Sequence, residues 1–133
     1  MSSAKTSATP DGGDTGTWVG IDHVQLAIPV GAEDAAREFY VGVLGLTEEP
    51  KPAVMAARGG AWFGAGAVRL HVGPEDPFVP ARKAHPALLM TDLVGFVEAS
   101  GLGAAAVWNT EIEGLVRCHI KDPFGNRIEL VQA

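Results

Sequence analysis

The stretch DPFGNRIELV, residues 122–131, decides how the rest of the sequence is interpreted. Its first half has the composition of a turn, and its second half, from Arg127 onward, alternates as a β-strand does. Glu129 lies in the middle of this apolar strand, where a carboxylate is costly to bury unless something pairs with it. Three explanations are open: the strand face is solvated, Glu129 has a salt-bridge partner, or Glu129 binds a metal ion.

An internal repeat connects this strand to an earlier one. Arg69-Leu70-His71-Val72 aligns with Arg127-Ile128-Glu129-Leu130, which places His71 at the position of Glu129. A histidine opens the first expected strand of each half, His23 in one and His85 in the other, and the two pairs are separated by similar lengths of chain. A repeat of this kind fixes the architecture before any motif is interpreted.

The repeat predicts an α+β fold of two tandem βαβββ modules, residues 18–73 and 85–133, joined by a proline-rich linker, residues 74–84. Residues 1–17 are small, polar and rich in glycine, and we expect a disordered tail there. The expected elements of the first module are strand 21–28, a helix over 32–44 stopped by Gly45, and strands 53–58, 61–63 and 67–72. Those of the second are strand 85–91, a helix capped by Asp92 and ended by Gly101, and strands 104–108, 114–121 and 127–132.

Alternation along the strands sorts the side chains onto two faces. Arg69 and His71 share one face of their strand, and Arg127 and Glu129 share one face of theirs. Each sheet is therefore expected to cover its helix with an apolar face and to carry a polar face rich in His, Arg and Glu. If the two sheets curl toward one another, the polar faces line a shared cavity and surround Glu129 with imidazoles.

Composition excludes several classes of function. A chain of 133 residues with 47% hydrophobic residues can bury a core, and no apolar run approaches the roughly 20 residues of a membrane span. The net charge is −6 and the cations are scattered, so we expect no nucleic-acid partner and no membrane partner. The single cysteine, Cys118, cannot form an internal disulfide and suits a reducing cytoplasm. We expect Trp108 and Phe124 to pack in the core.

The repeat, the two opening histidines and the closing DPFGNRIELV resemble the vicinal oxygen chelate superfamily. The stretches Phe39-Tyr40 to Leu44-Gly45-Leu46 and DPFGN are also typical of such proteins. Members include glyoxalase I, methylmalonyl-CoA epimerase, extradiol dioxygenases, fosfomycin-resistance enzymes and bleomycin-resistance proteins. The resemblance covers residues 18–132, and it indicates the fold more strongly than the reaction, because one fold hosts several chemistries.

The resemblance implies a metal site at four positions. His23 and His85 match the first-strand ligands of the two modules, Glu129 matches the closing carboxylate, and His71 occupies the fourth position. Other members often carry a carboxylate or a glutamine there, so His71 is open to use as a ligand, a base or a substrate contact. Imidazole and carboxylate donors suit Zn, Ni, Co, Fe or Mn. Glu129 and His71 are the candidate catalytic residues.

The leading hypothesis is a metal-dependent lyase or isomerase of the glyoxalase type that chelates a small oxygenated substrate. An extradiol-type dioxygenase and a ligand-sequestering protein of the bleomycin-resistance type are the alternatives. Exposed sheet edges favour a homodimer. The cavity can belong to one chain or to two. The candidate substrate contacts are cationic or aromatic residues expected on the cavity side: Arg58, Trp62, Arg69, Arg117 and His119.

Overall fold

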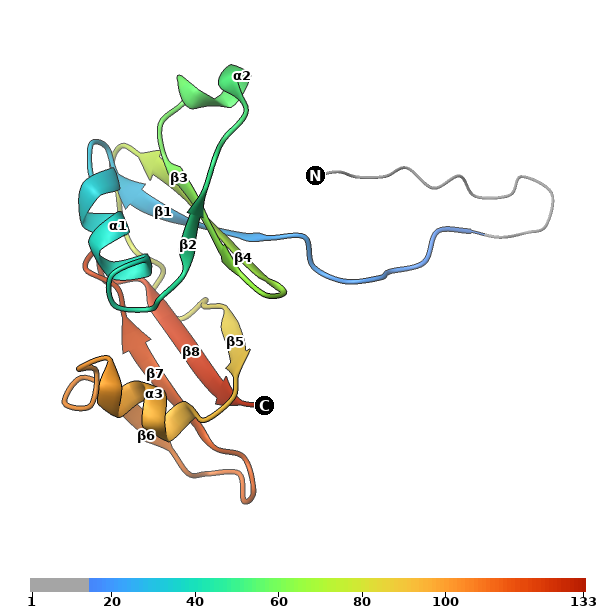
Figure 1. The fold of residues 1–133 in the computed structure, drawn as a ribbon, viewed down its shortest axis with the longest axis vertical. Coiled ribbons are helices and arrows are strands. Elements are labelled where there is room, and N and C mark those ends of the chain that lie inside the picture. The colour runs from blue at the N-terminus through green and yellow to red at the C-terminus, as the bar shows by residue number, and fades with distance from the viewer. Residues whose placement is uncertain (1–14) are drawn as a thin grey trace.

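The computed structural model describes residues 15–133, and it contains two βαβββ units in tandem (Figure 1). Of the expected tail, residues 1–14 lie outside this range, and residues 15–17 are exposed and carry no regular secondary structure. No helix in the described part of the chain is long and apolar enough to cross a membrane.

The first module is a four-stranded sheet with the strand order β1-β4-β3-β2. Its first strand runs parallel to β4, and the other neighbours are antiparallel. Helix α1 packs against β3. The elements are β1 (Val24–Pro29), α1 (Glu33–Tyr40), β2 (Thr47–Glu49), α2 (Ala53–Ala56), β3 (Ala61–Ala65) and β4 (Val68–Glu75).

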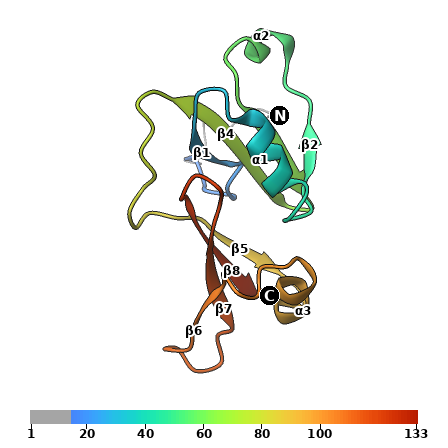
Figure 2. The ribbon, with the colours of Figure 1, turned by 90° about the vertical axis from the view of Figure 1, so that its left-hand side faces the viewer.

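The second module repeats the arrangement with the order β5-β8-β7-β6, again parallel at its first pair and antiparallel elsewhere. Helix α3 packs against β8. The two modules lie one above the other in both ribbon views (Figures 1 and 2). The elements are β5 (Ala87–Met90), α3 (Leu93–Ala99), β6 (Val107–Asn109), β7 (Arg117–Lys121) and β8 (Arg127–Gln132).

Apolar side chains from both modules form one core. Apolar and polar residues alternate along the strands, and the apolar face of each sheet is buried. Phe63 and Leu70 are 0% exposed in the first module, and Cys118 and Ile128 are 0% exposed in the second. The Cys118 thiol is therefore inaccessible, and burial raises its pKa. Burial of the helix-facing side leaves the His, Arg and Glu side chains on the opposite face, as the alternation predicted.

The DPFGN turn joins the two modules. Asp122 is buried and accepts hydrogen bonds from the Tyr40 hydroxyl at 2.7 Å and from the Asn126 side chain at 2.8 Å. The same Asn126 amide donates to the Ala27 carbonyl of β1 at 2.8 Å. Gly125 adopts a φ of 94°, which a side chain rarely allows. The turn therefore bonds to both α1 and β1 of the other module.

Three local expectations were wrong. Residues 53–56 form a single helical turn, because Pro52 precedes an alanine-rich run with good helix propensity. The short strand Thr47–Glu49, which has no apolar alternation, was not expected and is held by pairing with β3. Trp108 is 39% exposed because β6 ends the sheet and offers only one paired edge.

The expected helix boundaries are only partly right. Asp92 caps α3 as predicted, with its carboxylate accepting from the Gly95 amide at 3.3 Å, and Gly101 has a φ of 82° just beyond the helix. The first helix ends at Tyr40, and residues 41–44 continue as turns before Gly45 with a φ of 78°. Both histidines expected to open the modules precede their strands instead of lying within them.

Candidate functional site

Glu129 lies on the polar face of β8, in the centre of the second sheet. It is 7% exposed, so the solvated explanation for this carboxylate is excluded. Strand pairing places it directly opposite His119 on β7 and beside Ala87 on β5. On a pleated sheet, residues that are directly opposite project their side chains to the same side. The register therefore brings His119 to Glu129 although ten residues separate them in sequence.

Three cationic or imidazole groups surround the Glu129 carboxylate. Arg117 donates from Nη1 to Oε2 at 3.1 Å. On the other oxygen, Oε1, His85 Nε2 lies at 3.0 Å and His119 Nε2 lies at 3.6 Å. The Nε atom of Arg117 is buried without a hydrogen-bond partner among the described residues. One carboxylate oxygen is thus held by a guanidinium, and the other faces two imidazoles.

The hydrogen bonds of His85 indicate a place for a cation. Its Nδ1 lies 2.7 Å from the Lys83 carbonyl oxygen, which only accepts, so Nδ1 carries a proton. Its Nε2 then faces Glu129 Oε1, a second acceptor. With Nδ1 as the donor, Nε2 directs its lone pair toward the Oε1 side, and a cation there would be held by both atoms. A histidine that donates one ring N–H to a backbone carbonyl is the usual arrangement of a metal ligand.

The donor set fits a divalent transition metal. One ligand atom from each of His85, His119 and Glu129 lies within 4.8 Å of the other two, and this is the only such group of three or more among residues 15–133. Two imidazoles and one carboxylate suit Fe, Mn, Co, Ni or Zn and leave coordination positions open. Arg117 holds the carboxylate oxygen that faces away from the imidazoles, as a supporting contact to a ligand does.

The protonation states also suit metal binding. Burial alone would raise the pKa of Glu129, but hydrogen bonds from His85 and Arg117 outweigh it, and the pKa lies below its usual value. Burial and the nearby Arg127 guanidinium lower the pKa of His119. At neutral pH, Glu129 is therefore ionised and His119 is neutral, the forms in which both groups bind metal.

The first module carries an aromatic stack at the equivalent place. The rings of His23 and His71 are stacked with centroids 4.0 Å apart, and the Trp62 ring covers His71 at 4.3 Å with an interplanar angle of 7°. His71 is 8% exposed, and its burial and the neighbouring His23 lower its pKa. These residues line a hollow of about 630 Å³ together with Gln25, Glu49, Pro52, Met55 and Arg69.

The four expected ligands divide between the two modules. His85 and Glu129 lie together, whereas His23 and His71 form the separate stack and join no ligand cluster in the described chain. His23 and His85 do line one hollow of about 790 Å³ that runs along the edge strands β1 and β5. The four-ligand set remains a prediction, and within a single chain only its second-module half is assembled.

The expected substrate contacts are divided in the same way. Arg117 and His119 are at Glu129, and Trp62 is in the stack of the first module. Arg69 binds Glu49 with its Nε at 3.3 Å and donates to the carbonyls of residues 66 and 68, so its charge is already paired. Arg58 follows α2 and does not line the hollow at His71.

His119 was expected as a substrate contact and not as a metal donor. Alternation within residues 117–121 placed it on the polar face, but its proximity to Glu129 depends on the register between β7 and β8. The tight turn at residues 122–126 sets that register, since the Asp122 amide donates to the Asn126 carbonyl at 2.9 Å. Counting back across this hairpin from Glu129 reaches His119, which is the signal that could have identified the pair.

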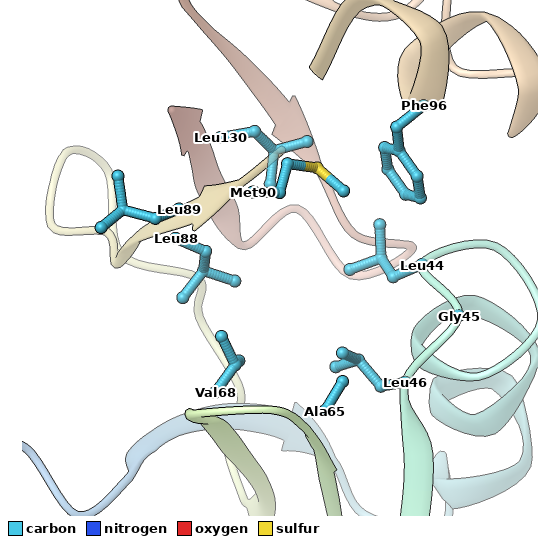
Figure 3. Close-up of a pocket in the computed structure, with 10 residues that line it drawn as sticks. All are labelled: Leu44, Gly45, Leu46, Ala65, Val68, Leu88, Leu89, Met90, Phe96 and Leu130. Atoms are coloured by element: carbon cyan, nitrogen blue, oxygen red, sulfur yellow. The ribbon is translucent and has the colours of Figure 1, made fainter. Parts of the chain in front are cut away.

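An apolar cavity of about 170 Å³ lies between the modules, away from these polar faces (Figure 3). Leu44 and Leu46 approach it from the first module, and Met90, Phe96 and Leu130 approach it from the second. No titratable side chain lines this cavity.

Comparison with known proteins agrees with this architecture. No family model matches the sequence, and no curated protein matches it. Among solved structures, a glyoxalase family protein from Bacillus anthracis shares 38% identity over 90% of this chain and 98% of its own, with a TM-score of 0.84. The fosfomycin resistance protein FosX from Listeria monocytogenes has 13% identity and a TM-score of 0.66, covering 88% and 95% of the two chains.

Lactoylglutathione lyase from Agrobacterium tumefaciens has 21% identity and a TM-score of 0.57, with coverage of 83% of this chain and 92% of its own. The two more distant likenesses support the fold alone, whereas the B. anthracis protein matches in sequence as well over nearly its whole length. The chain therefore belongs to the glyoxalase family, within the vicinal oxygen chelate superfamily.

Proposed function

We propose that this protein is a divalent-metal-dependent enzyme of the lyase or isomerase type that acts on a small oxygenated substrate. The observation that carries the proposal is the cluster at Glu129, where two imidazoles and an ionised carboxylate lie within 4.8 Å of one another. His85, His119 and Glu129 would hold the ion. When bound, the ion would supply Lewis-acid polarisation of substrate oxygens and stabilise the negative charge that develops on them.

The residues around the cluster prepare it for this use. The Lys83 carbonyl fixes the ring of His85, and Arg117 fixes the carboxylate of Glu129. Both constraints are present before any ligand binds, so little reorganisation is needed during the reaction. Burial of Glu129 keeps bulk water from competing for the carboxylate.

We further propose that the proton acceptor is His71 of a second copy of the chain. Its lowered pKa keeps the ring neutral at pH 7, as a base requires. Within one chain, His71 is not part of the ligand cluster at Glu129. The first strands of the two modules, β1 and β5, each end a sheet and have one unpaired edge, which supports a homodimer that joins the modules of two chains. The lone, buried Cys118 supports a cytoplasmic location.

Metal analysis tests the proposal. Protein stripped with a chelator, then reconstituted with Mn, Fe, Co, Ni or Zn and dialysed, should retain about one ion per chain. Glu129→Gln and His85→Gln should lose it. His119→Gln should lose it if the ligands belong to one module. His23→Gln should lose it if the ion binds the set of ligands expected from the sequence, which includes His23. Wild-type protein that retains no ion with any of the five metals would refute the enzyme and favour a ligand-sequestering protein.

A second candidate function is an extradiol-type dioxygenase. The observation in its favour is the donor set itself, because two histidines and one carboxylate leave three positions of an octahedral ion open, enough for two substrate oxygens and O₂. Oxygen uptake with catechol and Fe(II) identifies this activity. Formation of lactoylglutathione from methylglyoxal and glutathione, with oxygen excluded, identifies a glyoxalase-type lyase. Activity only in the first assay would overturn the leading proposal.

A further inference from the structure

The polar face of the second sheet carries more positive charge than its single carboxylate can balance. Arg117, Lys121 and Arg127 all project from this face, because they lie an even number of residues from His119 or Glu129 on the same strands. Glu129 is the single acidic residue in strands β7 and β8. Its carboxylate already contacts Arg117 and His85. The remaining two cations, Lys121 and Arg127, therefore have no carboxylate of these strands left to pair with.

Strand pairing sets these two cations directly opposite each other. The register between β7 and β8 pairs Lys121 with Arg127. Like charges at directly opposite positions destabilise a sheet. Within residues 15–133, neither side chain makes an ion pair or a side-chain hydrogen bond. An anion bound between the two side chains would offset this repulsion.

The internal repeat supplies a matched comparison. Arg69 holds in β4 the position that Arg127 holds in β8, but Arg69 pairs with Glu49 at 3.3 Å and donates to two backbone carbonyls. The residue opposite Arg69 is Gly64, whereas the residue opposite Arg127 is Lys121. The first module thus neutralises its arginine internally, and the second module adds a second cation instead.

The position of the pair relates it to the proposed reaction. Arg127 is two residues from Glu129 on the same strand face, roughly 7 Å along the strand. Lys121 is also two residues from His119 on β7. Arg127 is partly buried and Lys121 is exposed, so a ligand can reach the pair from solvent. An arginine fork and an ammonium beside it suit a carboxylate, phosphate or phosphonate group.

We propose that Lys121 and Arg127 form an oxyanion-binding subsite next to the cluster of His85, His119 and Glu129. The inference rests on the proposed function in one respect, that the anion is part of the substrate. The substrate is then a small molecule that carries an oxyanion separate from the oxygens at the metal cluster. Two cations near a divalent ion also weaken its binding, so an anion bound between them strengthens it, and the two ligands bind cooperatively.

Phosphate binding by metal-free protein tests the subsite. Inorganic phosphate is titrated calorimetrically at constant ionic strength maintained with sodium chloride, against wild type, Arg127→Gln, Lys121→Gln and Arg69→Gln. We expect wild-type binding and a loss of roughly tenfold in affinity for each of the first two variants, as removal of a charge-assisted contact gives. The matched control, Arg69→Gln, should bind as wild type does. Methylphosphonate and acetate, titrated in the same way, show which oxyanion is preferred.

Thermal unfolding separates this role from a structural one. Because Lys121 and Arg127 have no partner to lose, Arg127→Gln should unfold at the wild-type temperature or above it, whereas a structural arginine would lower it. Equal phosphate affinity in wild type and Arg127→Gln, equal loss in Arg69→Gln, or phosphate binding that chloride abolishes would overturn the subsite. Phosphate binding at this pair in a protein that never retains a divalent ion would uphold the subsite and refute the metal-dependent function.

Discussion

The contact between Tyr40 and Asp122 offers a measurable test of how the two modules are joined. Tyr40 is 0% exposed, and its hydroxyl donates to Asp122 Oδ2 at 2.7 Å. Burial raises the pKa of the tyrosine, with Asp122 adding to the effect, so the hydroxyl keeps its proton throughout the working pH range. We consider the substitutions Tyr40→Phe and Asp122→Ala, singly and together.

The structure gives the size of each effect. Tyr40→Phe removes one hydrogen bond to a charged acceptor, worth about 1.5–3 kcal/mol, and leaves the other contacts of Asp122 in place. Asp122→Ala also removes the bonds from the Phe124 amide at 2.9 Å and the Asn126 amide at 2.8 Å, and it leaves a buried hydroxyl without an acceptor. We expect a loss of about 4–5 kcal/mol, a large share of the stability of a small protein.

The double substitution gives the sharpest outcome. Once Asp122 is absent, the Tyr40 hydroxyl is a buried group without a partner, so replacing it with phenylalanine should cost nothing or should restore stability. Urea unfolding of the four proteins, followed by circular dichroism, measures the coupling. Equal costs of Tyr40→Phe in the wild-type and Asp122→Ala backgrounds would refute the reasoning. Metal affinity should be unchanged in Tyr40→Phe, because His85, His119 and Glu129 all belong to the second module.

Three further predictions concern charge and exposure. The folded-state pKa values of His71 and His119 lie below 6.5. Their contribution to stability is therefore present above pH 6.5 and is lost as the pH falls through the folded values. His71→Gln and His119→Gln should flatten this part of a plot of unfolding free energy against pH, measured with urea. The pKa of Glu129 is depressed below 4.5, so its contribution is present above pH 4.5 and is lost on further acidification, and Glu129→Gln should remove that loss. Trp18 is 100% exposed, so Trp18→Phe should remove the most red-shifted tryptophan fluorescence without changing the unfolding temperature.

Sequence patterns identified the elements that bury a regular apolar face. Strand β8 occupies Arg127–Gln132 as expected, because strict alternation and a tight turn define both its faces and its start. The tandem modules and the Asp92 cap were also predictable, since a repeat and a capping residue are local features of the sequence. Elements without such a signature were missed. The strand Thr47–Glu49 has no buried alternation, and it forms because β3 offers it a partner.

The sequence predicted which face of each strand the site residues occupy, but not which of these residues contact one another. Alternation placed His119 and Glu129 on polar faces, but a one-residue change in register would separate them. The expected convergence of His23 and His71 with His85 and Glu129 depends on how the modules are placed, which no local pattern determines. The structure assembles only the second-module pair in one chain.

The repeat explains why the two polar faces differ in chemistry. Strand pairing makes Trp62 the counterpart of His119, since Trp62 lies opposite His71 and His119 lies opposite Glu129. In the first module, these two positions carry the flat rings of Trp62 and His71, which stack on one another. The nearby carboxylates of Asp22 and Glu49 bond to His23 and Arg69 instead. In the second module, the same two positions carry the His119 imidazole and the Glu129 carboxylate. These two groups lie opposite each other on adjacent strands and can both donate to one metal ion. A difference at two equivalent positions of a duplicated unit thus gives the second module an imidazole and a carboxylate beside His85, while the first module carries two stacked rings there.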